Sequence, residues 1–367
     1  MRPSSIVVGA GLFGCYAAIV LASRGEDVTI VDQDPRILSR ASFVNQARVH
    51  TGLHYPRSRT TATEALARYR RFRERFEACI VDFPHIYAIA TWGSKTAPDD
   101  LHGFADSLGL QIRDVPPNEW FRPGTVGRAF LVEEPAFDAA TLRELLSEEL
   151  SRLGVRVLLE RWVVGASGGG TGVQITLDDG DRLRADRAIL ATYSATNEVR
   201  RHFGLEPWGL SHELTEVILG KALGRLSGRG FTVMDGPFWS MMPFGKTGRS
   251  SLTSVGFTPL RRAEGEPVFP CQTQRSDCTS SRIQDCNRCP VAPPSALRHH
   301  LQQMSSFLLD ADDFDPQERL LTVKTILKAA DVDDARPTVV ETGLDGRVVS
   351  ILSGKVSTVL DLEEALP

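Results

Sequence analysis

The first fifty residues alternate between short apolar runs and one longer apolar segment. Residues 6–8 form an apolar run, a glycine-rich turn follows, the chain then stays apolar to about Ser23, and residues 28–31 form a second short run. Short apolar runs bounded by turn residues are typical of buried strands, and a longer run between them is typical of a helix. The pattern predicts a strand, a helix and a second strand, in that order.

The turn after the first strand reads Gly9-Ala-Gly-Leu-Phe-Gly14, and Asp32 follows the second strand. With this spacing the first glycine allows a tight turn, the second lets the backbone approach a pyrophosphate, and the third lets the helix pack on the strand. The helix N-terminus then faces phosphate charge, and the acidic residue is placed to bind a ribose. The unit is predicted to bind a dinucleotide through Gly9, Gly11, Leu12, Phe13, Gly14 and Asp32.

Later segments continue the pattern of strands and helices. Five leucines between residues 142 and 153 follow a helical period, Gly154 ends that helix, and a strand follows. Residues 184–196 are interpreted as a strand that ends in small residues, and residues 345–366 as a strand, a glycine turn and a helix. The glycine run at residues 165–172 lacks the helix that a phosphate-binding loop needs, so a hairpin tip is predicted there.

Between residues 205 and 317, runs of β-branched and aromatic residues are separated by glycine and proline. Examples are HELTEVILGKAL, GFTVMDGPFWSMMPF and SSLTSVGFTPL. Runs of this composition between turn residues predict an antiparallel sheet.

Two short motifs resemble the FAD-dependent oxidoreductases of the D-amino-acid oxidase superfamily. SILSGKVST, residues 350–358, is similar to the GGK-(L)-TT segment of the glycerol-phosphate and hydroxyglutarate branch, with Ser353 in place of the first glycine. ARVHTGLHY, residues 47–55, is similar to the GVIHAGIHY segment of the hydroxyglutarate branch, with Arg48 at an otherwise apolar position. The resemblance implies that the dinucleotide is FAD and that residues 47–55 lie along its isoalloxazine ring.

The resemblance also implies the fold class and the division of the chain. The expected fold is α/β, with a Rossmann-type, glutathione-reductase-like FAD-binding domain assembled from separated segments, and an α+β substrate domain built on an antiparallel sheet. The expected FAD-binding segments are 1–80, 130–204 and 318–367, and the expected substrate-domain segments are 81–129 and 205–317, which include a cysteine-rich loop at 271–289.

The C-terminal glycine turn has an implied role at the flavin. A helix that begins after Gly354 would point backbone N–H groups at the N1/C2 carbonyl region of reduced flavin, and Lys355 would add positive charge. Beyond the first unit, the residues expected to contact FAD are Gln46, Arg48, Val164, Ala191, Thr192, Gly354, Lys355, Val356 and Ser357.

The expected reaction is oxidation of a C–N or C–OH bond of a small polar substrate by hydride transfer to flavin N5. An anionic substrate is one of the candidates. His54 aligns with the second histidine of the family motif and is the first candidate for a proton acceptor, with His50 as the second. Arg48 would bind a substrate anion or the FAD pyrophosphate. The candidate pocket walls are Tyr55, Trp239 and Met241. The alternative is a redox-neutral flavoenzyme, or a flavin-bearing partner protein whose substrate another protein delivers.

Four of the six cysteines lie within nineteen residues, at Cys271, Cys278, Cys286 and Cys289. A CxxC pair with two further thiols can supply the tetrahedral sulfur shell of a structural zinc site, which is the favoured interpretation. An iron–sulfur cluster, two disulfides and unliganded thiols stay open. His299 and His300 are substitute ligands, and both are expected on the surface of a helix.

Charge and hydropathy restrict the kinds of partner. The chain has 42 basic and 46 acidic residues, a net charge of −4, and we find no long basic run, so a nucleic acid is not expected. Arg24 interrupts the one candidate for a membrane span. A small-molecule substrate and a cytoplasmic location are expected, and the oligomeric state is not predicted.

Overall fold

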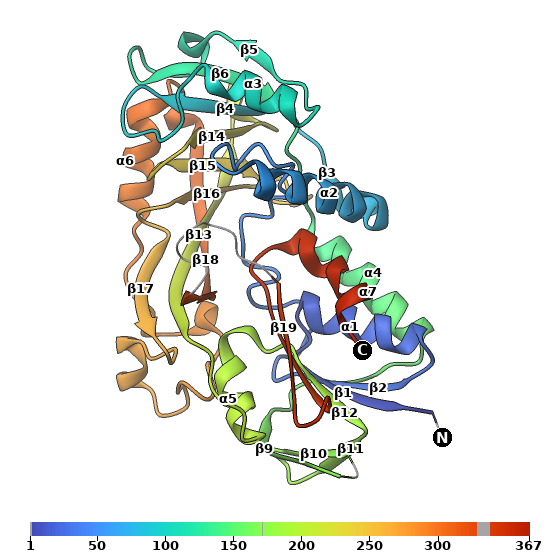
Figure 1. Cartoon of the computed structure of the whole chain (residues 1–367). Helices are drawn as coiled ribbons and strands as arrows, with labels where there is room; N and C mark the ends of the chain where they lie inside the picture. The colour runs from blue at the N-terminus through green and yellow to red at the C-terminus, as the bar shows by residue number, and fades with distance from the viewer. Residues whose placement is uncertain (1, 171, 329–337) are drawn as a thin grey trace.

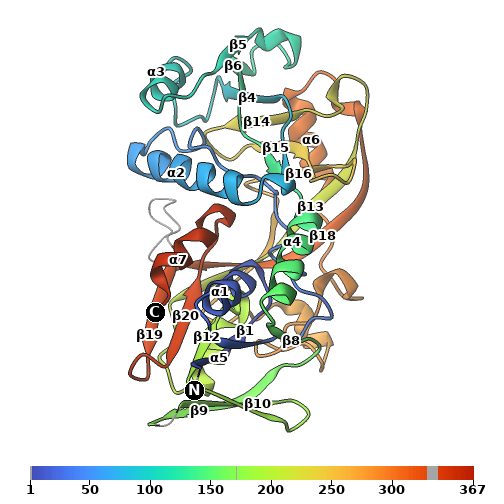
Figure 2. The same ribbon diagram turned by 90° about the vertical axis from the view of Figure 1, so that its right-hand side faces the viewer.

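The chain folds into two lobes, each built on its own β-sheet (Figures 1 and 2). The computed structural model describes residues 2–170, 172–328 and 338–367. In Figure 1 the larger sheet runs along the left side, and the smaller sheet with its helices lies at the lower right.

The smaller lobe contains a six-stranded sheet that confirms the predicted start of the chain. Strand β1 pairs in parallel with β2 on one side and with β12 on the other, and the other parallel pairs are β2 with β8 and β12 with β20. Only the edge strand β19 runs antiparallel to its neighbour. Across the sheet the strands are β19 (Val339–Gly343), β20 (Val348–Leu352), β12 (Arg187–Leu190), β1 (Ser4–Val8), β2 (Asp27–Val31) and β8 (Arg156–Leu158).

Both faces of this sheet are buried. Val7 and Ile189 share a hydrophobic core with helices α1 and α4, whereas Ile6 and Ala188 share a core with helix α5 and strand β10. Side chains alternate between the faces of a strand, so continuous apolar runs are what a sheet covered on both faces requires. The helices of this lobe are α1 (Leu12–Ser23), α4 (Ala139–Arg152), α5 (Thr196–His202) and the short C-terminal α7 (Leu362–Ala365).

The predicted glycine-rich hairpin belongs to a small antiparallel sheet beside this lobe. Most of the glycine run lies in strands, because β9 (Val163–Gly169) extends to Gly169 and β10 (Gly172–Leu177) begins at Gly172. The third strand is β11 (Arg182–Ala185). Gly154 follows α4 with a φ of +72°, a backbone conformation that favours glycine at a helix end.

The larger lobe contains the predicted antiparallel sheet, with nine strands. Its longest ladder joins β13 to β18, and the predicted domain boundary at residue 318 falls inside β18. Residue 130 likewise lies within β6, so both predicted boundaries fall inside strands of the larger sheet. In order the strands are β17 (Pro259–Glu264), β13 (Leu210–Ala222), β16 (Ser250–Ser254), β15 (Trp239–Pro243), β14 (Gly230–Met234), β4 (His85–Ala90), β6 (Val126–Val132) and β5 (Arg113–Val115), with β18 (Phe314–Leu327) paired to β13. A separate two-stranded sheet joins β3 (Ile80–Val81) and β7 (Ala136–Phe137).

Helices α3 (Asp100–Ser107) and α6 (Leu297–Phe307) accompany the larger sheet, whereas α2 (Arg59–Arg75) packs against the C-terminal 3-10 helix and shares the core of the smaller lobe. The expectation that His299 and His300 both lie on a helix surface is wrong for His300, because α6 turns that side chain toward β16, where its Nδ1 lies 3.1 Å from the Ser254 hydroxyl. Across the described part of the chain, no helix has the length and apolar character needed to cross a membrane.

The close packing of Gly14 against Gly9 generates a stability prediction. A Cβ added at Gly14 would lie 1.8 Å from the Gly9 carbonyl oxygen, so Gly14→Ala would push α1 away from β1. We expect a loss of at least ~3 kcal/mol in the free energy of unfolding, measured by urea denaturation.

Gly103→Ala is the control, because Gly103 lies inside α3 and a Cβ there meets nothing within 4 Å. That variant should gain about 0.5–1 kcal/mol from helix propensity. Equal effects of the two substitutions would contradict the close-packing role of Gly14.

Candidate functional site

A cavity of about 1720 Å³ lies between the two lobes. Its walls come from the glycine turn and β2 of the smaller lobe, from the connection after β2, and from β13, β14 and β18 of the larger lobe. The C-terminal segment 351–357 closes one side. The cavity therefore collects segments that are far apart in the sequence.

The glycine turn forms a cradle at the N-terminus of α1. Gly9 has a φ of +103°, and a Cβ there would lie 2.5 Å from the Ala191 carbonyl oxygen. At Gly11 a Cβ would meet only the Ser42 hydroxyl, at 3.3 Å, so this glycine leaves the cradle open toward the cavity. The first N–H groups of a helix have no partners within the helix, which suits them to phosphate oxygens.

Asp32 lies at the end of β2 beside this cradle. Its carboxylate accepts hydrogen bonds from the backbone N–H groups of Ala10, at 2.5 Å, and Asp34, at 2.8 Å. Burial raises the pKa of Asp32, although these two N–H groups oppose the rise. The Thr192 hydroxyl, also in the cavity wall, is buried with no partner in the protein. The open glycine cradle, the acid and this unpaired hydroxyl fit the adenosine and pyrophosphate half of FAD.

The other residues predicted to contact FAD mostly reach the same cavity. Val164 does not line it, because its side chain is 48% exposed on the other side of β9 and Val163 faces the cavity instead. Gly14 packs against Gly9 rather than the cavity, as its predicted packing role requires. The cavity wall does include Gly9, Gly11, Leu12, Phe13, Asp32, Gln46, Arg48, Ala191, Thr192, Gly354, Lys355, Val356 and Ser357.

The predicted C-terminal helix begins at Val356 as a 3-10 helix, residues Val356–Asp361, and continues into α7. Lys355 precedes it, with its Nζ 4.4 Å from the centroid of the Tyr55 ring. Tyr55 lines the cavity as expected, but Trp239 and Met241 lie in the core, and Ser240 between them faces the cavity. Alternation along β15 explains this correction.

The opposite end of the cavity is organised by Glu134, which the sequence analysis did not single out. Its side chain is fully buried, and one carboxylate oxygen accepts a hydrogen bond of 2.5 Å from the Tyr87 hydroxyl and lies 3.0 Å from His50 Nδ1. The other oxygen accepts from the Thr51 hydroxyl and backbone N–H, at 3.2 and 3.4 Å. The sequence feature that could have indicated Glu134 is the pair of acidic residues, Glu133 and Glu134, directly after the strand sequence VGRAFLV.

Arg48 supplies the compensating charge. Its Nη1 lies 3.6 Å from the Glu134 carboxylate and donates to the Tyr87 hydroxyl at 3.1 Å, and its Nη2 donates to the Thr232 hydroxyl at 2.9 Å. The arginine side chain is only 2% exposed. The structure therefore places Arg48 within the buried network, where it supports other side chains, and not at the pyrophosphate cradle.

The hydrogen bonds assign different tautomers to His50 and His54. His50 Nδ1 faces a carboxylate, so this nitrogen carries the proton and Nε2 keeps its lone pair. His54 Nδ1 lies 3.3 Å from Arg48 Nη1, and because a guanidinium can only donate, this nitrogen accepts and Nε2 carries the proton. His50 is thus arranged as a proton acceptor, and neutral His54 as a hydrogen-bond donor.

Burial controls the titration of the network. It lowers the pKa of His50 against the opposing effect of Glu134, and it lowers the pKa of His85 to about 3. Burial alone would raise the pKa of Glu134, but the hydrogen bond from His50 and the charge of Arg48 hold it well below its usual range. The carboxylate is therefore ionised while the histidine that it contacts stays neutral at pH 7.

The four clustered cysteines lie in the loop 271–289, here called the cysteine loop, between β17 and α6. They line one small cavity of about 20 Å³ together with Leu214, Phe269 and Ile283. Burial raises the pKa of Cys286 to about 12. A metal site would need at least three ligand atoms close together. Among the described residues, His50, His54 and Glu134 have such atoms within 4.8 Å of one another, and no three of the four thiols do. The thiols are therefore near one another but more widely spaced than in a bound metal site.

Comparison with known proteins agrees with this geometry. The family model described as FAD dependent oxidoreductase, of the DAO type, matches residues 5–242. The chain belongs to this family. The predicted membership of the D-amino-acid oxidase superfamily, the fold class and the expectation of an FAD-dependent oxidoreductase are confirmed.

Two curated relatives match part of the chain. The FAD-dependent monooxygenase FPY4 of Fusarium mangiferae is 30% identical over 120 residues, which is 32% of this chain and 32% of that protein. The FAD-dependent monooxygenase kojA of Aspergillus flavus is 30% identical over 175 residues, which is 43% of this chain and 38% of that protein. The matches thus span well under half of either relative.

Solved structures match almost the whole chain at low identity. L-alpha-glycerophosphate oxidase from Mycoplasma pneumoniae, solved with FAD bound, has a TM-score of 0.74 and 12% identity, and covers all of this chain and 94% of its own. Glycine oxidase from Geobacillus kaustophilus has a TM-score of 0.70 and 14% identity, and covers 99% of this chain and 92% of its own. At these identities the likeness shows the fold.

The buried network predicts a pH dependence of stability. Since the pKa of His85 falls from about 6.5 in the unfolded chain to about 3 in the folded one, only the unfolded chain binds a proton there between these values. The free energy of unfolding should therefore fall by about 1.4 kcal/mol for each pH unit below 6.5 through this group alone. Urea denaturation at pH 7, 6 and 5 measures the slope.

His85→Gln should reduce the dependence of the free energy of unfolding on pH by about 1.4 kcal/mol per pH unit. This reduction should be seen even if the substitution also lowers the free energy of unfolding at pH 7. His299→Gln, at an exposed position of α6, is the matched control. A slope unchanged in His85→Gln would show that His85 does not titrate as the buried network requires.

Proposed function

We propose that the protein oxidises a C–N or C–OH bond of a small polar substrate, with FAD as the electron acceptor and His50 as the proton acceptor. The observation that carries the proposal is the contact between His50 Nδ1 and the buried Glu134 carboxylate, at 3.0 Å, in the wall of the FAD-sized cavity. A carboxylate that binds one imidazole nitrogen holds the other as a proton acceptor.

FAD, when bound, takes up the two electrons that leave the substrate carbon. The residues that would hold it are the glycine cradle and Asp32 at the adenosine end, and Gln46 and the backbone of 354–357 at the other end. His50 Nε2 would accept the proton that leaves the substrate nitrogen or hydroxyl oxygen. Its lowered pKa keeps it unprotonated at pH 7, so it is ready to accept.

His54 has a different proposed role. With its proton on Nε2 it would donate a hydrogen bond to substrate or cofactor, and Arg48 would fix this tautomer by donating to Nδ1. The assignment of His54 as the favoured base is therefore replaced by His50, and Arg48 becomes a positioning residue. Lys95 and Lys355 bring positive charge to the cavity wall, which favours an anionic substrate.

Anaerobic mixing with amino acids, hydroxy acids, amino sugars and polyol phosphates tests the proposal, with bleaching of the flavin absorbance as the readout. We expect one of these classes to bleach the flavin. Recovery in air would identify an oxidase, and recovery only with an added acceptor would identify a dehydrogenase. A flavin that dithionite reduces but no substrate reduces would favour a redox-neutral flavoenzyme or a partner-dependent flavoprotein.

The base assignment gives a specific prediction for the reducing substrate found in that experiment. His50→Gln should slow flavin bleaching by about 10²- to 10⁴-fold. The wild-type rate should fall with decreasing pH through a pKa below 6.5, and this dependence should disappear in the variant. His54→Gln is the matched control and should keep the pH dependence. Loss of the pH dependence in His54→Gln alone would overturn the assignment.

We further propose that the cysteine loop binds one structural Zn²⁺ through Cys271, Cys278, Cys286 and Cys289. Support comes from the four thiols that line one cavity. Zinc would draw the sulfur atoms to about 3.8 Å from one another, as its tetrahedral geometry and bond length require. Elemental analysis should give one zinc per chain. Iron with acid-labile sulfide would instead support an iron–sulfur cluster, and four titratable thiols without metal would contradict both.

A further inference from the structure

The cysteine loop lies beside the adenosine end of the dinucleotide cavity, although it belongs to the larger lobe. It follows β17 at the lower left of Figure 1, and its residues Arg282, Gln284 and Asp285 line the same cavity as Asp32 and Asp34. A loop that was assigned to the substrate domain therefore forms part of the wall opposite Asp32.

On one side the loop is anchored to the larger sheet. The side-chain amide of Asn287 donates to the Leu321 carbonyl at 3.0 Å and accepts from the Leu321 N–H at 2.6 Å, as a strand neighbour would. Ile283 and Phe269 are buried against Leu214 and Val323 of the sheet. These contacts hold the loop to β13 and β18.

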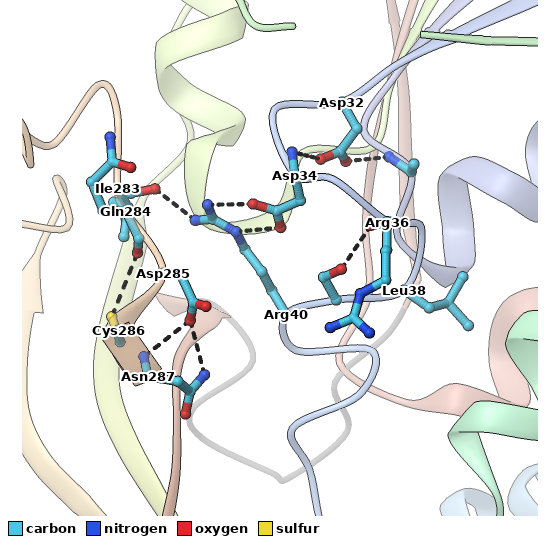
Figure 3. Close-up of polar contacts among 12 residues, drawn as sticks. Asp32, Asp34, Arg36, Leu38, Arg40, Ile283, Gln284, Asp285, Cys286 and Asn287 are labelled. Carbon is cyan, nitrogen blue, oxygen red and sulfur yellow. Dashed lines mark hydrogen bonds and ion pairs between the residues drawn. The ribbon is translucent and has the colours of Figure 1, made fainter. Parts of the chain in front are cut away.

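On the other side the loop reaches the smaller lobe through Arg40 (Figure 3). The Arg40 guanidinium makes two hydrogen bonds to the Asp34 carboxylate, at 2.7 and 2.8 Å, and Nη1 donates to the Ile283 carbonyl at 2.7 Å. Asp34 in turn donates its backbone N–H to Asp32. A continuous chain of hydrogen bonds thus joins the predicted ribose-binding acid to the cysteine loop.

A second bridge lies at the same end. The guanidinium carbon of Arg282 is 3.5 Å from the centroid of the Trp162 ring, in the connection between β8 and β9. Both residues line the cavity. Two arginines, one from each lobe, therefore bridge the lobes at the end of the cavity where Asp32 lies.

Regular secondary structure is sparse in the loop, and its internal hydrogen bonds join residues that are near in sequence, such as the Gln284 side chain and the Asp277 carbonyl. Between Phe269 and Cys289 its regular structure consists of two 3-10 turns, Pro270–Gln274 and Cys286–Arg288. A cross-link would further restrict a segment of this length, which has few buried apolar side chains. The four thiols around one interior cavity are placed to supply it.

We propose that the cysteine loop is a clasp that holds the adenosine half of the bound dinucleotide, and that metal bound by its four thiolates keeps the clasp in shape. The proposal rests on the FAD and zinc sites proposed above. It assigns the loop to cofactor retention, through the Arg40–Ile283 and Arg282–Trp162 contacts, and not to the chemistry at the flavin.

Arg40→Met tests the clasp without touching a cysteine. A hydrogen bond from a charged donor is lost, so we expect the Kd of FAD, measured by dilution of the holoenzyme and fluorescence of the released flavin, to rise about 10-fold. The zinc content should stay at one per chain. Arg298→Met, an exposed arginine of α6, is the matched control and should leave the Kd unchanged.

Competition between ADP and FAD shows which half of FAD depends on Arg40. ADP carries the adenosine half of the cofactor alone, so a contact to that half weakens ADP and FAD together. The ADP concentration that displaces half of the FAD should therefore be the same for Arg40→Met and the wild type. If about 10-fold less ADP displaced half of the FAD from Arg40→Met, the lost contact would belong to the flavin half. If the Kd of FAD were unchanged in Arg40→Met, Arg40 would not contribute to FAD binding. Either result overturns the clasp.

The metal is tested with Cys278→Ser, for which circular dichroism and thermal unfolding verify folding. The clasp would be supported if Cys278→Ser lost zinc and raised the Kd of FAD as much as Arg40→Met does. The double variant, Arg40→Met with Cys278→Ser, should then show no further rise in that Kd. A folded, zinc-free variant with wild-type FAD affinity would overturn the coupling. If the wild type contains no zinc but Arg40→Met still weakens FAD and ADP together, the zinc proposal fails and the clasp contact stands.

Discussion

The buried carboxylate of Glu134 is the constraint on which the candidate active site depends. A charge removed from water between two lobes has to be compensated by donors and by an opposite charge, or it would cost several kcal/mol. Here the compensation comes from Arg48, His50 and Thr51, in the connection after β2, and from Tyr87 in β4. One carboxylate therefore fixes the position of groups from two separate parts of the chain.

The backbone around this charge is arranged to deliver those donors. Val49 donates its N–H to the Pro135 carbonyl and Phe137 donates to the Ala47 carbonyl, so residues 47–49 run antiparallel to residues 135–137. Ala47 adopts a φ of +57°, held by a hydrogen bond from its N–H to the Asn45 side chain. Residues 48–50, which include His50, are thereby presented to the cavity as an extended segment, and a turn at residues 52–55 carries His54.

A second polar chain runs through the same region and explains why His85 stays neutral. Arg48 donates to the Thr232 hydroxyl, which lies 2.9 Å from His85 Nε2, and His85 Nδ1 lies 3.1 Å from the Glu134 carbonyl oxygen. Neutral imidazole satisfies both contacts, because one nitrogen accepts and the other donates. A protonated ring would present a second donor toward a hydroxyl that already accepts from Arg48. The larger sheet thus contributes to the site through β4 and β14 as well as through the walls of the cavity.

The pattern of apolar residues and glycines was sufficient to determine the first strand–helix–strand unit of the smaller lobe. Continuous apolar strands, the Gly9 to Gly14 spacing and the acid after β2 are local features, and local features predict a parallel strand pair, its helix and its cradle. The same local reasoning placed most of the cavity-lining residues, because they adjoin the ends of those strands. It could not place residues whose partners come from another segment. The carboxylate that sets the role of His50 lies 84 positions later in the sequence, just after β6, and Arg40 meets the cysteine loop across both lobes. Hydrogen-bond direction, and with it the choice of base, depends on which atoms meet in three dimensions, so only the tertiary structure decided it.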